Sequence, residues 1–174
     1  TVVIDYASPN VAKPMHVGHL RAAMVGQAIR NLAASQGYKV IGVNHLGDWG
    51  SQFGKLAWAY LEWGAEYDFS VKPIDSWLKL YVRFHEEAEK NPEIEHLGAV
   101  TFKKLEDGDL EIKKIWQKIV EDSLKDYDRL LNGLLKIKHD AILGESFYTD
   151  KMESAIQLLK EKNLLKESEG AQVV

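Results

Sequence analysis

The sequence predicts an α/β fold with a parallel sheet, interrupted by a helical insertion. Two runs rich in β-branched residues, 2–4 and 38–43, flank an amphipathic stretch. A strand, a helix and a strand in that order form a βαβ unit, in which the two strands are parallel by default. Apolar residues then keep a helical period over most of 75–136. With 174 residues, the chain suits one compact domain with one sizeable insertion.

The composition is that of an ordinary globular protein and excludes disordered, collagen-like and disulfide-bonded classes. Hydrophobic types make up 45% of the residues. The chain has no cysteine, which excludes Cys-type zinc sites and thiol catalysis, and no metal site is predicted. Because no apolar run of membrane-spanning length and no signal-peptide pattern exist, the sequence predicts a soluble, cytoplasmic protein. Net charge is +3 over residues 1–60 and −7 over the rest, so an anionic ligand is expected at the first third.

The first βαβ unit is well defined. A buried strand at residues 2–4 runs into the turn-forming residues 7–10. A helix is expected from near His16 to Gly37, a glycine suited to a C-terminal cap, and the second strand covers 38–43. The apolar residues that give the helix its period are Val17, Leu20, Met24, Ala28, Ile29 and Leu32.

The middle of the chain is predicted to be helical. A loop at 44–50 leads into a helix that ends at Gly64, and residues 65–74 form a linker or lid. The helical period of 75–136 has breaks at Asn91-Pro92 and Gly108-Asp109. The last of these helices is the most regular, with an apolar face formed by Ile112, Ile115, Trp116, Ile119, Val120, Leu124, Tyr127, Leu131, Leu134 and Leu135.

The end of the chain is predicted to contain a strand with a loop at 136–147, a helix at 150–162 and a hairpin at 164–174. The hairpin is expected to turn at Glu169-Gly170. The chain opens without Met in an apolar run and stops at a second β-branched pair, Val173-Val174. Both ends are therefore interpreted as cuts from a longer protein.

One segment carries the chemistry. Between the first strand and the first helix, where a doubly wound sheet binds its ligands, the sequence reads Pro9-Asn10-Val11-Ala12-Lys13-Pro14-Met15-His16-Val17-Gly18-His19. The N–H groups at a helix start favour phosphate, and His16 and His19 lie on one face of the first turn. Gly18 lets a base or ribose approach the backbone, and Lys13 adds a positive charge. The segment therefore predicts binding of a nucleoside triphosphate and stabilisation of charge at an attacked α-phosphate.

Each of these residues has a plainer explanation when taken alone. A histidine pair at this spacing is a weak signal, and a zinc site lacks a third ligand and the Glu of the metalloprotease helix motif. Gly18 fits tight helix packing equally well, and Lys13 fits a solvated loop. The nucleotide interpretation is favoured because all four residues lie within seven positions, directly after a strand.

His16-Val17-Gly18-His19 resembles the "HIGH" motif of class I aminoacyl-tRNA synthetases. The wider run from Ser8 to Arg21 is similar to that of arginyl-tRNA synthetases in particular. A second run, Asn44-His45-Leu46-Gly47-Asp48-Trp49-Gly50-Ser51-Gln52-Phe53-Gly54, also resembles the arginyl enzymes and stands at the expected distance. Weaker resemblance continues through Tyr127-Asp128-Arg129-Leu130 and Gly144-Glu145-Ser146, so it spans most of the chain.

The resemblance implies the first half of a Rossmann-like nucleotide-binding domain. Arginine and ATP, with Mg2+ on the triphosphate, would give arginyl-adenylate and pyrophosphate, and the arginyl group would then pass to tRNA(Arg). The family's Lys-Met-Ser-Lys-Ser motif is missing from the sequence, because the only Lys-Met pair, Lys151-Met152, is followed by Glu153. The family's N-terminal and anticodon-binding domains are missing too. We therefore expect a fragment of a synthetase, inactive by itself, that meets tRNA mostly through domains outside it.

The same resemblance divides the chain and assigns roles. Residues 1–64 would be the nucleotide-binding βαβ unit, 65–136 the helical insertion, and 137–174 a truncated strand, helix and hairpin segment of the catalytic domain. The catalytic residues would be His16, His19 and Lys13, acting by positioning and electrostatics, and the ATP-binding residues His16, Gly18 and His19. The arginine-binding residues would be Asp5, which faces the guanidinium, Ser8, Pro9, Asn10, His19, Asp48 and Gln52.

Other interpretations remain open. Asp5 could cap a strand end, Asp48 could be the N-cap of the following helix, and Trp49 is more often a packing residue than a stacking platform. A small-molecule nucleotidyltransferase with an HxGH loop is a second enzyme class, but it calls for neither the long helical insert nor the 44–54 run. A catalytically silent module is a third class, although the mixed charge of 75–136 gives no basic stripe for tRNA.

Overall fold

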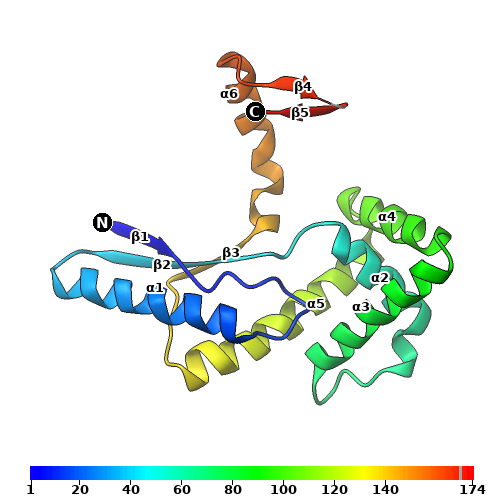
Figure 1. Cartoon of the computed structure of the whole chain (residues 1–174), viewed down its shortest axis with the longest axis horizontal. Helices are drawn as coiled ribbons and strands as arrows, with labels where there is room; N and C mark the ends of the chain where they lie inside the picture. Colours follow the sequence, from blue (N-terminus) through cyan, green and yellow to red (C-terminus); the bar gives the residue numbers. More distant parts are fainter. Residues whose placement is uncertain (169) are drawn as a thin grey trace.

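The computed structural model describes residues 1–168 and 170–174 (Figure 1). In the labels, η1 and η3 are 3-10 helices and η2 is a π-helix. The elements are, in chain order, β1 (Val2–Asp5), α1 (Val17–Ser35), β2 (Val40–Leu46), α2 (Ser51–Trp63), η1 (Gly64–Glu66), α3 (Pro73–Lys90), α4 (Glu93–Glu106), α5 (Leu110–Asp128), η2 (Arg129–Leu134), β3 (Ala141–Gly144), η3 (Glu145–Lys151), α6 (Met152–Glu161), β4 (Lys166–Ser168) and β5 (Ala171–Val173).

The sheet that positions the site has three parallel strands in the order β1-β2-β3. Asp5 at the end of β1 lies beside Val43 of β2, and Leu46 at the end of β2 lies beside Gly144 of β3. The chain leaves the sheet after β2, builds the helices α2 to α5, and returns to it at β3 (Figure 1). The predicted α/β fold with a parallel βαβ unit and a helical insertion is confirmed.

α1 lies along the sheet but turns its apolar stripe away from it. Its buried residues are the small Ala23 and Gly26, and a Cβ on Gly26 would come within 2.2 Å of Tyr6 Cβ. Small side chains let the helix approach the sheet closely, so the predicted helix is confirmed while its larger apolar residues do not form the contact. The exposed members of the stripe are Val17, Met24, Ile29 and Leu32.

The helices α2 to α5 pack on one another at one end of the molecule (Figure 1). α2 and α4 lie close together because Gly54 has no side chain: a Cβ there would come within 2.4 Å of the Gly98 carbonyl oxygen. Trp77 and Phe84 of α3 and Ile119 of α5 are fully buried in this helical unit. α2, which follows β2 directly, thus ties the helical unit to the end of the central strand.

α5 carries the helical unit back toward the sheet. It begins at the N-cap Asp109, whose Oδ1 accepts the N–H groups of Glu111 and Ile112 at 2.9 and 3.1 Å. The predicted apolar face is largely buried, at Ile112, Ile115, Ile119, Tyr127 and Leu131. The helix predicted to about residue 136 runs as a regular α-helix to Asp128 and continues as the π-helix η2 to Leu134, a change of helix type that the period did not predict.

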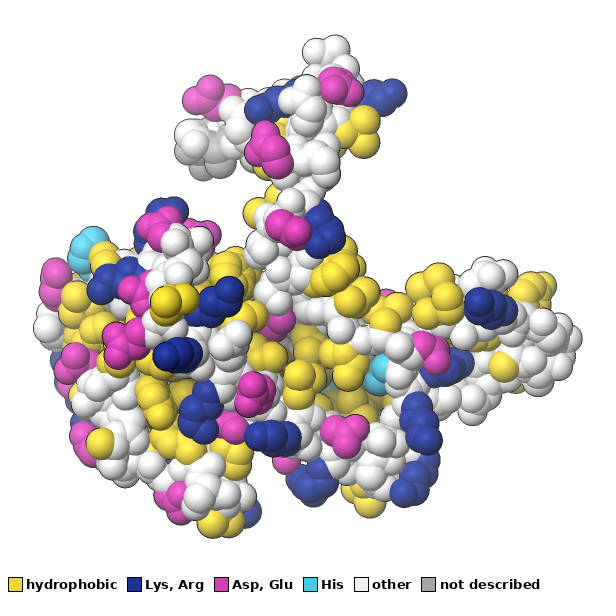
Figure 2. Space-filling model, turned by 180° about the vertical axis from the view of Figure 1, so that it is seen from behind, with side chains coloured by type: hydrophobic (Ala, Val, Ile, Leu, Met, Phe, Trp, Pro, Cys, Tyr) yellow, Lys and Arg dark blue, Asp and Glu magenta, His cyan; other side chains and the backbone are white. Residues whose placement is uncertain are grey.

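The end of the chain projects from the rest of the molecule (Figures 1 and 2). The strand predicted within 136–147 is limited to β3, because the chain turns into η3 directly after Gly144. The predicted helix is α6, and β4 and β5 pair antiparallel as the predicted hairpin. Glu169, predicted in its turn, lies outside the described residues. No helix in the described part of the chain combines the length and apolar character needed to cross a membrane.

Candidate active site

The predicted motif forms a loop across the carboxyl ends of β1 and β2. Asn10 pairs with Gly47 in an isolated parallel bridge. The N–H of Val11 donates to the Gly47 carbonyl at 3.1 Å, and the N–H of Gly47 donates to the Pro9 carbonyl at 3.2 Å. Gly47 is required because a Cβ there would come within 1.9 Å of Asn10 Oδ1. Pro9 is buried in this contact, whereas the side chain of Asn10 stays exposed.

Three residues of this loop adopt left-handed backbone conformations that non-glycine residues rarely use. Their φ angles are +76° at Ala7, +43° at Ser8 and +65° at Ala12. Such conformations persist where the surroundings hold them, and they gather at functional sites. The N–H of Ser8 donates to Oδ1 of the buried Asn44 at 3.0 Å, so β2 holds one of these residues directly. The conformation of the loop is therefore fixed by its contacts with the rest of the molecule.

His16 and His19 meet at the start of α1. Their ring centroids lie 3.9 Å apart. His16 is the N-cap: its Nδ1 accepts the Gly18 N–H at 3.1 Å, and His19 Nδ1 accepts the His16 N–H at 3.3 Å. Each accepting Nδ1 leaves the proton of a neutral imidazole on Nε2. Burial, and secondarily the neighbouring His16, lower the pKa of His19, which favours this neutral form.

Gly18 makes room for that arrangement. A Cβ at this position would come within 2.9 Å of His16 Cε1, so the missing side chain lets the His16 ring fold over the helix start. With both Nδ1 atoms occupied by helix capping, the pair presents two Nε2–H donors beside the positive end of the helix dipole. An anionic group such as phosphate is favoured there.

Asp5 and Ser8 come together at the end of β1. Ser8 Oγ donates to Asp5 Oδ1 at 2.6 Å, and the N–H of His45 donates to the same oxygen at 3.3 Å. Asp5 is exposed, and its Oδ2 has no hydrogen-bond partner in the described part of the chain. Asp5 therefore does form the strand-end contact considered from the sequence, and it still offers one carboxylate oxygen to a cationic ligand.

The carboxylate of Asp48, which follows β2, accepts hydrogen bonds from Ser146, which follows β3, and so connects the ends of these two strands. Asp48 is buried, and its carboxylate accepts the Ser146 N–H at 2.8 Å and the Ser146 hydroxyl at 2.7 Å. Gly144 permits this contact, since a Cβ there would come within 2.1 Å of Asp48 Oδ2. The alternative of Asp48 as a helix N-cap is wrong, because α2 is capped at Gly50 without a side-chain bond.

The side chains of Lys13 and Gln52 both lie near Tyr81 of α3, in the helical unit. Lys13 Nζ stands 5.1 Å from the centroid of the Tyr81 ring of α3, within the range of a cation–π contact. Gln52 lines a hollow of about 270 Å³ together with Gly50, Ser51, Lys55 and Tyr81. Trp49 packs edge-on against Phe102 and Trp116, which favours the packing interpretation.

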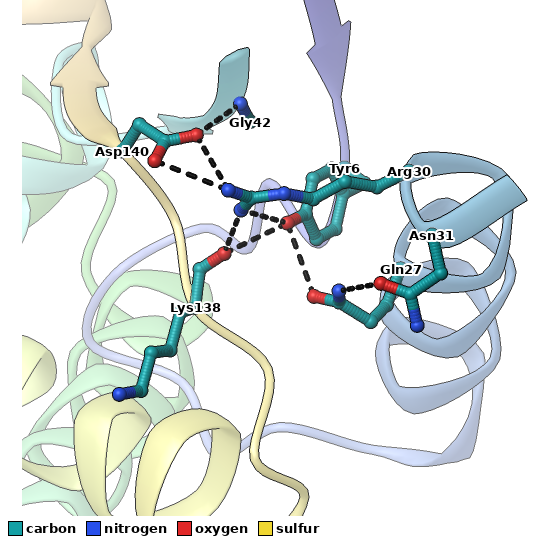
Figure 3. A network of polar contacts seen from close by, with 7 residues as sticks. All are labelled: Tyr6, Gln27, Arg30, Asn31, Gly42, Lys138 and Asp140. Atoms are coloured by element: carbon teal, nitrogen blue, oxygen red, sulfur yellow. Dashed lines mark hydrogen bonds and ion pairs between the residues drawn. The ribbon is translucent and has the colours of Figure 1, made fainter. Parts of the chain in front are cut away.

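A polar network fixes Tyr6, the residue between Asp5 and the left-handed turn (Figure 3). Arg30 of α1 donates to the Tyr6 hydroxyl at 3.2 Å and pairs with Asp140 at 2.9 Å. The Tyr6 hydroxyl lies 2.9 Å from the Lys138 carbonyl, and Asp140 accepts the Gly42 N–H at 2.7 Å. The Gly42 hydrogen bond and Arg30 lower the pKa of Asp140. The network ties α1, β2 and the segment before β3 to the end of β1.

The family described as "tRNA synthetases class I (R), catalytic domain" matches residues 1–174. The chain belongs to this family. The parallel three-stranded sheet is accordingly that of the Rossmann-like class I synthetase catalytic domain.

Individual relatives agree over the whole chain. The arginine–tRNA ligase of Clostridioides difficile (strain 630) is 52% identical over 174 residues, which is 100% of this chain and 31% of the relative. That of Leuconostoc mesenteroides is 50% identical over 173 residues. The arginyl-tRNA synthetase of Plasmodium falciparum superposes with a TM-score of 0.79 at 32% identity, covering 98% of this chain and 28% of that one. The Thermus thermophilus enzyme superposes with a TM-score of 0.72 at 26% identity and the same coverage.

The synthetase chain thus spans about a third of the length of the curated relatives it matches. Four residues that hold the loop were not predicted from the sequence as contacts of the motif. Asn44 and Tyr127 both stand in the quoted runs, yet their hydrogen bonds to the loop depend on the packing of distant elements. Ser123 and His139 lie outside those runs, and no sequence signal singles them out.

Proposed function

We propose that the chain is the first part of the catalytic domain of an arginine–tRNA ligase, which activates arginine with ATP and transfers it to tRNA(Arg). The observation that carries the proposal is the placement, at the two ends of one loop, of a free carboxylate oxygen at Asp5, the last residue of β1, and of two Nε2–H donors at His16 and His19, at the start of α1. A carboxylate suits a cationic guanidinium, and donors at a helix start suit a triphosphate. The identity of the relatives as arginine–tRNA ligases supports arginine as the amino acid.

In the proposed reaction, an oxygen of the arginine carboxylate attacks the α-phosphorus of ATP. The bond from that phosphorus to the bridging oxygen breaks, and pyrophosphate leaves with the electron pair. His16 and His19 donate to phosphate oxygens on which charge grows, and Lys13 adds a positive charge from the loop. Gly18 leaves the space for His16. Mg2+ arrives with the triphosphate and offsets part of its charge.

The arginine site in this proposal is centred on Asp5, Ser8 and Asn10 at the sheet end and includes His19 at the start of α1. Pro9 and Asp48 are buried, so they act by shaping the loop and the strand ends rather than through free polar groups. Gln52 lines the hollow next to the loop. This distinction between contacting and shaping residues is testable by substitution.

The domain division is also part of the proposal. Residues 1–64 act as the nucleotide-binding unit, 65–136 as the helical insertion and 137–174 as the returning segment of the catalytic domain. tRNA meets the longer protein mainly through parts outside this chain, and the chain alone is proposed to be inactive. The cytoplasmic location remains a prediction.

A nucleotidyltransferase and a silent module are the alternatives. The first would transfer a nucleotidyl group without any amino acid, and the second would perform no chemistry. The deciding experiment is arginine-dependent exchange of labelled pyrophosphate into ATP by the full-length protein, with and without tRNA, and with lysine as the control amino acid. We expect exchange in the presence of arginine and no exchange in the presence of lysine. Exchange independent of amino acid indicates the nucleotidyltransferase, and none under any condition contradicts the proposal.

A further inference from the structure

The loop between β1 and α1 is held by backbone hydrogen bonds to side chains of other elements. β2 contributes Asn44, described above, and the segment before β3 contributes His139, whose Nε2 lies 3.1 Å from the Tyr6 carbonyl. The remaining two side chains, Ser123 and Tyr127, both come from α5 of the helical unit. A helix far along the chain therefore holds the loop in which the candidate motif lies.

Ser123 fixes the left-handed residue Ala12. The serine is fully buried, and its Oγ accepts the Ala12 N–H at 2.9 Å. Its own proton goes to the Ile119 carbonyl at 2.7 Å, so the oxygen lone pair is oriented toward the loop. Ala12, at a φ of +65°, has no other hydrogen bond to its N–H in the described part of the chain. A single oxygen atom thus stabilises an unfavourable backbone conformation next to Lys13.

Tyr127, one turn further along α5, holds the same loop on either side of Ala12. Its hydroxyl lies 2.7 Å from the Asn10 carbonyl and 2.7 Å from the Lys13 carbonyl. The loop therefore curls around one buried hydroxyl, whose single proton serves two acceptors. Burial raises the pKa of this phenol, which keeps it a donor. Directly after Tyr127 and Asp128, α5 changes to the π-helix η2, a rare feature that is frequent at functional sites.

We infer that Ser123 and Tyr127 are positioning residues for the reaction proposed above: they set the path of residues 10–13 and so place Lys13 and the His16–His19 pair. The inference rests on the proposed function. Neither residue touches substrate in this account, because both side chains are buried against the loop backbone. Through them the helical insertion controls the geometry of the candidate active site, where a displacement of about 1 Å costs roughly a hundredfold in rate.

The experiment uses the full-length protein and compares Tyr127→Phe with wild type. The phenylalanine keeps the ring in the core and removes only the hydroxyl. Tyr60→Phe is the matched control: Tyr60 is a half-buried tyrosine of the same helical unit, its ring contacts those of Phe69 and Trp77, and its hydroxyl has no hydrogen bond in the described part of the chain. Ser123→Ala is a second variant that removes one oxygen on the other contact.

Four quantities are measured for each variant: kcat and KM of arginine-dependent pyrophosphate exchange, the melting temperature, and the rate of amide hydrogen exchange in peptides that cover 8–16. We expect Tyr127→Phe and Ser123→Ala to lower kcat per folded molecule at least about tenfold. We also expect them to speed amide exchange in the loop, while Tyr60→Phe matches wild type in both. A merely structural role would lower the melting temperature and leave kcat per folded molecule unchanged.

The outcomes separate the two claims. An active wild type with equally active Tyr127→Phe and Ser123→Ala proteins overturns the positioning role and leaves the proposed function standing. A wild type without arginine-dependent exchange overturns the proposed function itself. If Tyr127→Phe fails to fold, the decision falls to Ser123→Ala, because its single missing oxygen leaves the helix and its packing in place. A tenfold loss of kcat in Tyr60→Phe would also overturn the inference, since the effect would not be specific to the loop contacts.

Discussion

At the scale of single residues, the histidine pair serves both the fold and the proposed chemistry. The Nδ1 atoms cap α1, and that capping fixes the tautomer which leaves each Nε2–H for phosphate. The hydrogen bonds that cap the helix therefore orient the Nε2–H groups for the proposed hydrogen bonds to phosphate. We therefore expect the motif to be sensitive to substitution, although His16 is exposed and His19 is only half-buried.

His16→Ala and His19→Ala in the full-length protein should lower the rate of adenylate formation by an amount equivalent to about 2.7–4 kcal/mol each, the usual loss for one preorganised donor. Arginine binding should change far less, because the donors act mainly on charge that grows in the transition state. Single-turnover kinetics and arginine titration measure the two effects separately. Unchanged adenylate formation in both variants would remove the pair from the active site.

Asp5→Asn should raise the KM for arginine at least about tenfold, or about 1.4 kcal/mol, while the KM for ATP stays nearly constant. The amide keeps the size and one accepting oxygen but loses the charge that pairs with the guanidinium. Steady-state exchange kinetics with each substrate varied in turn checks this. Equal increases for arginine and ATP would mark Asp5 as a strand-end residue only.

Stability should depend on pH through His19 and His139. Burial lowers both pKa values; the hydrogen bond to the Tyr6 carbonyl opposes this at His139. Between the pKa of the folded state and about 6.5, the unfolded chain binds more protons than the folded chain. The contribution of the two neutral histidines to the free energy of unfolding is therefore complete above pH 6.5 and is lost as the pH falls through the pKa values of the folded state. Urea unfolding between pH 5 and 8 should show a flatter dependence for His139→Asn than for wild type. His96→Asn, at an exposed position, is the control, and an unchanged slope in His139→Asn would contradict the assignment.

Residue types and spacing were enough to locate the motif, because its chemistry depends on neighbours in sequence. His16, Gly18 and His19 do lie together, and so do Asp5 and Ser8. The contacts of Asp48 with Ser146 could not be read from the chain, since they span 98 positions. For the same reason, nothing in the spacing indicates that α5 holds the loop.

At the scale of elements, the contact between α1 and the sheet includes a polar network and does not use the large apolar residues of the helix. Arg30 bridges Asp140 and the Tyr6 hydroxyl (Figure 3), and glycines at 26 and 42 leave the space for Tyr6. The helical period of α1 predicted the helix but not this contact, because a period shows that an apolar stripe exists and not which neighbour covers it. The boundary of α5 was missed for a related reason, since its apolar residues continue unbroken into the π-helix.

Asp140→Ala should destabilise the chain by about 1–3 kcal/mol, because it leaves the buried Gly42 N–H without its acceptor and removes the ion pair with Arg30. The matched control is Asp150→Ala, which removes a carboxylate from an exposed pair with Lys151 and should not change stability measurably. Urea denaturation of the 174-residue chain compares the two. Similar stability of both variants would show that the network is not what joins α1 to the sheet.

At the scale of the whole molecule, apolar surface is left open along α1 and on the projecting end of the chain. The exposed side chains include Val17, Met24, Leu32, Met152 and Leu158. Patches of this kind mark surfaces that pack on another structure. The chain corresponds to about a third of the length of its curated relatives, so its surface need not match that of the longer protein.

The 174-residue chain should therefore bind a hydrophobic dye such as ANS and associate with itself at micromolar concentration. Replacing two residues of the stripe, Met24→Lys and Leu32→Lys, should reduce both effects without loss of helix content, because these side chains make little contact with the sheet. Val100→Lys, a partly exposed residue on α4, is the control. Sedimentation and dye fluorescence measure the effects, and a monomeric wild type with no dye binding would contradict this account of the surface.

Charging of tRNA with labelled arginine decides whether this chain supplies the proposed ATP and arginine site of an arginine–tRNA ligase. The full-length protein should attach arginine to tRNA(Arg) in an ATP-dependent reaction. The same protein with both His16→Ala and His19→Ala should fold normally and lose that activity by at least about a hundredfold. Charging at the wild-type rate by the double variant, or no charging by the wild-type protein, would contradict the account.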